Sequence, residues 1–395
     1  MKRLAIFITV FLLLLVAAGC NAEDEIFRFA VFSDSRGQGK ADTCAGDNFG
    51  VSRALDTIVK SVLIKNVSHP MKLALFPGDM MSGGWKRDAV SVAECNRIQL
   101  LHWREVVKPI LDAGIRFSVT AGNHEAVASD GSVPRVMCSG HSSSYTPSAD
   151  NFKVFREVMA DMLQGRAGPD SDLGLTYSFD MGGCHFAVLS AYTMSRNNSF
   201  SDATLDWLDR DLAKAKAKGL IIFMASHPPA FPGGGHMWDS LPSFDPDYAC
   251  DHLKGIDRRQ DRDRFWDLLK KHNVVAYFCG HEHNIQVQRV EGVWQVVSAG
   301  LTTRLYPLNG SPWDTQRNTI LYDGRFQNPR ASVTWPWDET KKAYWGWCLV
   351  TVAGKKVTMD VIGSDVLPTK ESDLKPLKSF TLTDGASPPK TGPES

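Results

Sequence analysis

Five apolar, strand-like runs along the chain each end abruptly in a polar motif. The runs are Ile26–Phe32, Met71–Phe76, Ile115–Thr120, Leu220–Ala225 and Val274–Phe278. Helical patterns separate them, over Phe49–Lys65, Ala93–Ala113, Asn151–Leu163, Ala203–Lys218 and Arg259–Lys271. Alternating strands and helices predict an α/β fold, in which ligands bind at the carboxyl ends of the strands. We therefore expect the polar motifs to meet at one site.

These motifs carry imidazole, carboxylate and amide groups that can bind metal ions. The candidate metal ligands are Asp34, Asp79, Asn123, His227, His281 and His283. This mixed nitrogen and oxygen set suits Zn, Fe or Mn better than Mg or Ca, which prefer oxygen throughout. It is larger than one open catalytic zinc needs. It fits two metal ions that share a bridging carboxylate, an arrangement that supports phosphoryl transfer.

The motifs also resemble those of a known family. They read Gly78-Asp79, Gly122-Asn123-His124-Glu125, His227 after an apolar run, and Gly280-His281-Glu282-His283. On these residues the chain resembles the calcineurin-like metallophosphoesterases, which include the purple acid phosphatases. The resemblance covers about Phe27 to Ser298. It implies an α/β fold with a two-sheet β-sandwich flanked by helices, the four-layer fold of that family, over residues 26–365 with a loop insertion near 129–150.

The resemblance also implies roles for the candidate ligands. Asp79 would bridge two ions of Fe, Mn or Zn. The first ion would be held by Asn123, His227 and His281, and the second by Asp34 and His283. The glycines that precede several of these ligands would let the backbone approach the ions closely. Hydroxide activated by the ions would attack phosphorus.

Two further residues are expected to act on the substrate. The resemblance implies that His124 protonates the leaving oxygen or steadies the phosphate. Arg36 stands where the family usually has a histidine ligand, and Ser82 stands where purple acid phosphatases have a tyrosine, so we expect weak binding of the second ion. The planar guanidinium of Arg36 suits a pair of phosphate oxygens and predicts a substrate clamp. The alternative is a structural ion pair with Asp or Glu. Glu125 and Glu282 are expected to orient neighbouring histidines.

The first 20 residues have the pattern of an export signal. Lys2 and Arg3 precede the apolar stretch Leu4–Ala18, and small residues lead to Cys20. The pattern predicts a lipoprotein leader with a lipidated Cys20 that anchors the protein to a membrane. Ala17 stands where such leaders usually have Leu, which leaves simple secretion as the alternative. Both readings predict an exported protein, either a lipoprotein of the cell envelope or a secreted or periplasmic protein.

Export permits disulfide bonds. Cys44, Cys95, Cys138 and Cys250 are the candidates for bridges, and the sequence does not set their pairing. Cys184 and Cys279 lie in strand-like runs and are expected as buried thiols. Thr176–Asp180 and Cys184–Ser190 predict a hairpin, and residues 366–395 predict a flexible tail.

The expected function is that of an exported, metal-dependent phosphoesterase acting on small phosphomonoesters or nucleotides. A phosphodiesterase or pyrophosphatase of the same fold, and a catalytically weakened phosphate-binding envelope protein, are the alternatives. Lys and Arg together equal Asp and Glu in number, so the composition does not favour a nucleic acid polymer as partner.

Overall fold

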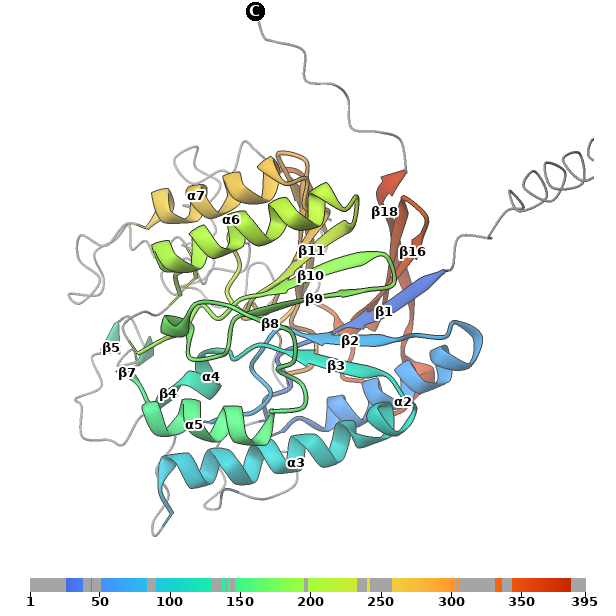
Figure 1. Ribbon diagram of the computed structural model, residues 1–395. Coiled ribbons are helices and arrows are strands. Elements are labelled where there is room, and N and C mark those ends of the chain that lie inside the picture. The colour runs from blue at the N-terminus through green and yellow to red at the C-terminus, as the bar shows by residue number, and fades with distance from the viewer. Residues whose placement is uncertain are drawn as a thin grey trace, which may run out of the picture.

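Two mixed β-sheets form the centre of the protein in the computed structural model (Figure 1). The structure describes residues 26–37, 44, 51–83, 90–128, 137–138, 141–142, 146–194, 198–232, 240–241, 258–302, 305, 331–335 and 343–384. The six-stranded sheet has the order β18-β17-β16-β1-β2-β3, and the eight-stranded sheet has the order β15-β13-β14-β12-β11-β10-β9-β8.

The strands of the first sheet are β1 (Phe27–Val31), β2 (Leu73–Phe76), β3 (Arg116–Val119), β16 (Trp345–Ala353), β17 (Lys356–Ser364) and β18 (Lys375–Asp384). Those of the second are β8 (Arg166–Ala167), β9 (Tyr177–Met181), β10 (Cys184–Val188), β11 (Ile221–Ala225), β12 (Ala276–Cys279), β13 (Ile285–Val290), β14 (Val293–Ser298) and β15 (Ala331–Trp335). Strands β1, β2 and β3 are parallel, as are β10, β11, β12 and β14. The carboxyl ends of each parallel set therefore meet at one edge of its sheet.

Helices cover the outer faces of both sheets. They are α2 (Arg53–Ser68), α3 (Val92–Asp112), α5 (Ala149–Val158), α6 (Asp202–Ala217) and α7 (Arg259–Lys271), with a short α4 (Asn123–Ala126) near the site. Helices α2 and α3 lie along β2 and β3, and α6 and α7 lie over β10 and β11 (Figure 1). A serine side chain accepts an N-terminal backbone N–H in four of these helices, at Ser52, Ser91, Ser148 and Ser201.

The alternation of residues on β1 shows how the layers are packed. Phe27, Phe29 and Val31 point into the core between the two sheets, whereas Ala30 and Phe32 belong to the core under the helices. The Phe29 ring lies 5.2 Å from that of Phe186 and 5.1 Å from that of Phe223, both on the opposite sheet. The predicted two-sheet sandwich flanked by helices is thus confirmed.

Two local predictions have different outcomes. The predicted hairpin is present, because β9 and β10 pair antiparallel across Gly182 and Gly183, which have φ of 56° and 73°. The prediction of a flexible tail over residues 366–395 is wrong for Lys375–Asp384, which form β18 on the edge of the first sheet. Short strands, β4 (Val127–Ala128) with β7 (Thr146–Pro147) and β5 (Met137–Cys138) with β6 (His141–Ser142), lie at or within the predicted insertion.

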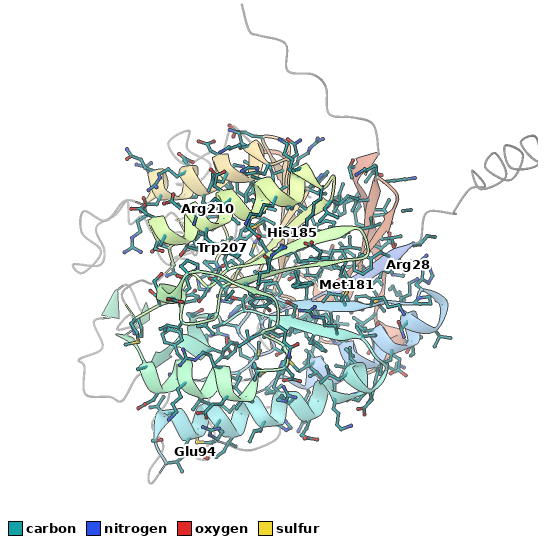
Figure 2. All side chains as sticks on the ribbon, in the orientation of Figure 1. Arg28, Glu94, Met181, His185, Trp207 and Arg210 are labelled. Atoms are coloured by element: carbon teal, nitrogen blue, oxygen red, sulfur yellow. A yellow bond between two sulfur atoms is a disulfide. The ribbon has the colours of Figure 1, made fainter. Side chains whose placement is uncertain are left out.

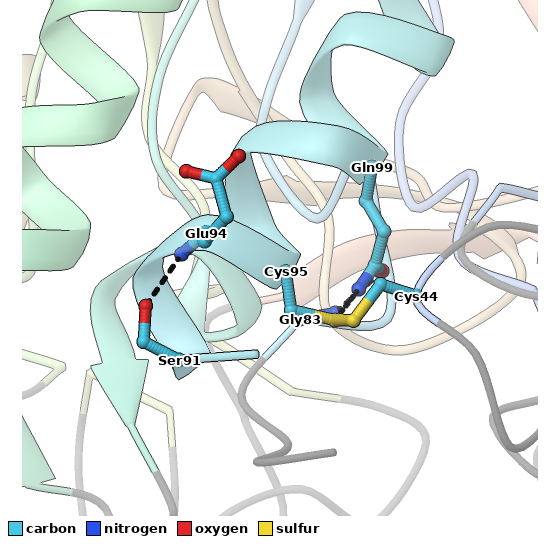
Figure 3. Close-up of a disulfide and its surroundings, with 6 residues drawn as sticks. All are labelled: Cys44, Gly83, Ser91, Glu94, Cys95 and Gln99. Carbon is cyan, nitrogen blue, oxygen red and sulfur yellow. Dashed lines mark hydrogen bonds between the residues drawn. A yellow bond between two sulfur atoms is a disulfide. The ribbon is translucent and has the colours of Figure 1, made fainter. Parts of the chain in front are cut away.

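A disulfide joins Cys44 to Cys95 on α3 (Figure 3). Gln99, one turn further along α3, accepts a hydrogen bond from the backbone N–H of Gly83 at 3.1 Å. Cys184 and Cys279 are buried free thiols as expected, and so is Cys348. The predicted leader with Cys20 and the bridge candidate Cys250 lie outside the described residues. Within the described ranges, no helix combines the length and apolar character needed to cross a membrane.

Candidate metal centre

Both sheets contribute residues to one buried cluster at the carboxyl ends of their parallel strands. Asp34 follows β1, Asp79 follows β2 and Asn123 begins α4 just after β3. From the second sheet come His227, after β11, and the pair His281 and His283, after β12. All six side chains are buried. Two groups of potential ligand atoms lie within 4.8 Å of one another. The first group comes from Asp79, His227 and His281, and the second from Asp34, Asp79 and His283.

The first of these groups presents the lone pairs that a metal ion binds. His227 donates its Nδ1–H to the carbonyl oxygen of Pro77 at 2.8 Å, so Nε2 carries the lone pair. This nitrogen faces Asn123 Oδ1 at 3.1 Å and Asp79 Oδ1 at 3.4 Å. Three acceptor atoms with no proton between them repel one another, and a cation shared by them removes that repulsion. The first position therefore fits a metal ion.

The second group is poorer in ligands. His283 Nε2 lies 4.0 Å from Asp34 Oδ1, and Asp34 also accepts hydrogen bonds from Ser33 Oγ and from the backbone N–H of His281. The hydroxyl of Ser35 donates to the carbonyl oxygen of Met80 at 2.8 Å. The hydroxyl of Ser82 donates to the carbonyl oxygen of Gly37 at 2.9 Å. Both hydroxyl hydrogens are thus directed at backbone carbonyl oxygens.

Four candidate ligands adopt left-handed backbone conformations, which are uncommon outside glycine. Their φ angles are 61° at Asp34, 56° at Asp79, 74° at His281 and 48° at His283. Strained residues of this kind cluster at functional sites, where the surrounding structure holds them in place. Four of the non-glycine residues with positive φ thus lie in the cluster of candidate ligands.

Glycines next to the ligands allow the loops to approach closely, as expected. A Cβ on Gly122 would lie 2.1 Å from Asp79 Oδ1, and one on Gly280 would lie 2.2 Å from Asp34 Oδ2. Neither distance is compatible with a side chain at that position. The two glycines are therefore required by the position of the carboxylates rather than by a turn alone.

The charges of the two aspartates are unequal. Burial, together with the charge of Asp79, raises the pKa of Asp34 well above its usual range. Burial alone would also raise the pKa of Asp79, but His227, His124 and Arg36 outweigh it and lower that pKa. Two carboxylates this close cannot both ionise at low cost without a positive charge between them. A cation between the two carboxylates would lower the cost of ionising both.

His124 and Arg36 lie beside the aspartates and contact each other. His124 donates Nδ1–H to the carbonyl oxygen of Ser82 at 2.6 Å, and its Nε2 accepts a hydrogen bond from Arg36 Nη1. Arg36 Nη2 lies 3.4 Å from His283 Nδ1. Burial lowers the pKa of His124 to about 4, and the charge of Arg36 acts in the same direction. Arg36 also interacts electrostatically with Asp34 and Asp79, so both the substrate clamp and the structural ion pair stay predictions.

Glu125 has a different role from the one expected. Its carboxylate accepts backbone N–H groups of Asp79 at 2.9 Å, Met80 at 2.8 Å and Gly122 at 2.7 Å. It therefore orients the loop that carries Asp79, not a neighbouring histidine. Burial raises its pKa to about 8. Glu282 accepts a hydrogen bond from Gln286 Nε2 at 3.3 Å.

The calcineurin-like phosphoesterase family model matches residues 27–284, which include every residue of this cluster. The chain belongs to that family. The chain is similar to Purple acid phosphatase 23 of Arabidopsis thaliana, with 30% identity over 182 residues, or 46% of this chain and 33% of that protein. The chain thus spans a third of the length of this curated relative.

Solved structures share the fold. The purple acid phosphatase PPD1 from yellow lupin (Lupinus luteus) seeds matches 91% of this chain and 54% of its own, with a TM-score of 0.58 and 15% identity. A dimetal phosphatase from Danio rerio matches 90% of this chain and 98% of its own, with a TM-score of 0.50 and 12% identity. At these identities the likeness concerns the fold, and the family prediction made from the motifs is confirmed by the family match.

Proposed function

We propose that this protein is an exported, metal-dependent phosphoesterase that hydrolyses small phosphomonoesters or nucleotides. One observation carries the proposal. The lone pair of His227 Nε2 faces Asn123 Oδ1 and Asp79 Oδ1, and the Arg36–His124 pair lies directly beside this acceptor cluster. A cation site next to a guanidinium and an imidazole has the groups needed to bind and cleave a phosphate ester.

The first position would hold its metal ion through Asp79, Asn123, His227 and His281. When bound, the metal would polarise a phosphoryl oxygen and lower the pKa of a nucleophilic water. The chain itself supplies the contacts that orient the ligands. The contact of His227 with Pro77 fixes its tautomer, and the contact of Glu125 with the loop after β2 fixes the position of Asp79.

Arg36 and His124 would bind and protonate the ester. The guanidinium offers N–H groups in a planar fork that matches two phosphate oxygens. His124 Nε2 accepts from Arg36 in the free site, and this contact favours the neutral imidazole. A phosphate that engages the guanidinium would release Nε2, which could then hold the proton that the leaving oxygen requires.

Export is part of the proposal and is supported by two features. Lys2 and Arg3 precede an apolar stretch that ends in small residues and Cys20. The Cys44–Cys95 disulfide fits an oxidising compartment outside the cytosol. Metabolic labelling with a fatty acid tests whether Cys20 anchors the protein, with Cys20→Ser as the unlabelled control.

The purified protein, loaded with Zn, Mn or Fe, should hydrolyse p-nitrophenyl phosphate faster than bis-p-nitrophenyl phosphate. Faster turnover of the diester would assign the protein to the phosphodiesterase alternative. A protein that binds phosphate but hydrolyses neither ester under any of these metals would be the catalytically weakened binding protein instead.

A further inference from the structure

Arg36 is held in one place by the structure around it. Its backbone forms a bridge with Val51, and the carbonyl oxygen of Ser35 accepts a hydrogen bond from Ser52 N–H at 2.6 Å. The Ser35 hydroxyl accepts a hydrogen bond from Trp103 Nε1 at 3.0 Å, which ties the same segment to α3. The guanidinium therefore reaches His124 and His283 from a fixed backbone.

The contact between Arg36 and His283 determines which nitrogen of His283 carries the proton. A guanidinium has only donors, so His283 Nδ1 must accept from Arg36 Nη2 with its lone pair. In a neutral imidazole the proton then lies on Nε2, the nitrogen that faces Asp34 Oδ1 at 4.0 Å. A protonated nitrogen has no lone pair to give to a metal ion.

The reverse arrangement is also unfavourable. If Nε2 of His283 bound a metal ion, the proton would move to Nδ1 and would point at the N–H groups of Arg36. Two donors would then face each other across 3.4 Å next to a further positive charge. The guanidinium in this position and a metal ion on His283 thus exclude each other.

The rest of the second position agrees with this. Among the described residues, the carboxylates and imidazoles that come together at this position are Asp34, Asp79 and His283, and the hydroxyls of Ser35 and Ser82 donate to backbone carbonyl oxygens.

We propose that this chain holds one resident metal ion, at the position formed by Asp79, Asn123, His227 and His281, and that the Arg36 guanidinium takes the place of a second ion. The inference rests on the proposed function for the first metal position. In this arrangement Arg36 neutralises Asp34 and Asp79 at rest, and binds the phosphate oxygens that a second ion would otherwise hold. The site is thus a mixed centre of one metal ion and one guanidinium.

The test is the number of metal ions bound per chain, which does not depend on activity. The purified full chain is stripped with a chelator, titrated calorimetrically with Zn²⁺, dialysed and analysed for metal by mass spectrometry. We expect one tightly bound equivalent in the wild type. Arg36→His recreates an Asp-x-His motif and should bind a second equivalent at least about tenfold more tightly than the wild type does.

Two variants serve as controls. Arg36→Lys keeps a cation at the same place and should stay at one equivalent. Arg264→His adds a histidine on the exposed face of α7, away from the site, and should also stay at one. Circular dichroism of each variant verifies that it is folded.

Each outcome decides the inference. Two tight equivalents in the wild type would overturn the substitution of Arg36 for the second ion and leave the proposed function intact. A folded Arg36→His variant that still binds one equivalent would show that Arg36 is not what excludes the second ion. A wild type that binds no metal would overturn the inference and the proposed function together.

Discussion

His124 lies at the edge of the candidate ligand cluster without being one of its members. Its Nδ1 is bonded to the carbonyl oxygen of Ser82, and its Nε2 points toward Arg36 and lies 3.8 Å from Asp79 Oδ2. The imidazole can therefore reach a phosphate ester bound beside the metal position. Removing it should affect proton transfer and leave metal binding unchanged.

We predict that His124→Ala lowers kcat for p-nitrophenyl phosphate by about 10²- to 10⁴-fold, the usual range for loss of a general acid. Metal content measured by mass spectrometry should stay at the wild-type value. His102→Ala, which removes an exposed histidine on α3, is the matched control and should retain full activity. Loss of metal from the His124 variant would instead place this residue among the ligands.

The amide of Asn123 has the opposite role. Its Oδ1 faces His227 Nε2 at 3.1 Å and His281 Nδ1 at 3.2 Å, so it should be a ligand. Asn123→Ala should therefore lose bound metal on dialysis, by at least about tenfold in affinity. Asn123→Asp keeps an oxygen at the same place and should retain the metal. Equal metal retention in both variants would remove Asn123 from the ligand set.

At the scale of elements, a second charged cluster joins β9, β10 and α6 outside the metal centre. His185 on β10 is fully buried beneath α6 (Figure 2). Its Nδ1 lies 2.7 Å from Asp180 Oδ1 and its Nε2 lies 3.0 Å from Asp211 Oδ2. Both ring nitrogens thus lie within hydrogen-bond distance of a carboxylate, and Nδ1 also lies 3.3 Å from Arg166 Nη2. Lys218 and Arg166 add positive charge around the same carboxylates.

This cluster predicts a loss of stability in acid. Burial would raise the pKa of Asp211, but the hydrogen bond from His185 and the charges of His185 and Arg166 lower it below 3.8. A carboxylate whose pKa is lower in the folded than in the unfolded state stabilises the folded state at pH values above its pKa in the unfolded state. This stabilisation disappears as the pH falls through its pKa in the folded state. Asp211→Asn should therefore destabilise the protein by about 3 kcal/mol at pH 6 and by less below pH ~4.

Urea denaturation at a series of pH values measures this difference. Asp206→Asn changes an exposed carboxylate on the same helix and should have little effect at any pH. If the difference between Asp211→Asn and the wild type is as large at pH 3 as at pH 6, the cluster does not stabilise the fold through charge.

At the scale of the whole molecule, the sequence predicted what depends on local pattern. The polar motifs after β1, β2, β3, β11 and β12 indicated which candidate ligands would come together, because strand direction brings those ends to one edge. The tautomers of His227 and His283 could not be predicted, since they depend on Pro77 and Arg36 from distant segments. The role of His185 was missed for the same reason, because its partners lie on other elements.

Strand β18 was missed for a different reason. Its residues are rich in Lys, Thr and Ser, which resemble a tail when read for composition. The side chains nevertheless alternate, with Phe380 and Leu382 buried and Thr381 exposed. Such a strand is stable only because the edge of β17 provides hydrogen-bond partners and the other sheet provides apolar contacts.

Strand β18 should therefore close one end of the core between the two sheets. The Phe380 ring lies 5.9 Å from that of Trp294 on β14, and Trp294 Nε1 donates to the carbonyl oxygen of Leu382 at 2.9 Å. Phe380→Ala removes a ring that joins both sheets and should lower the free energy of unfolding by about 3 kcal/mol.

Thr381→Ala is the matched control, because it alters the exposed face of the same strand and should cost less than about 0.5 kcal/mol. Chemical denaturation measures both variants. The candidate metal ligands follow β1, β2, β3, β11 and β12, whereas Phe380 lies on β18. Phe380→Ala should therefore reduce stability while leaving the number of bound metal ions unchanged in the folded protein. Equal effects of the two substitutions would mean that β18 contributes through its backbone pairing with β17 alone, and that the inter-sheet core is complete without it.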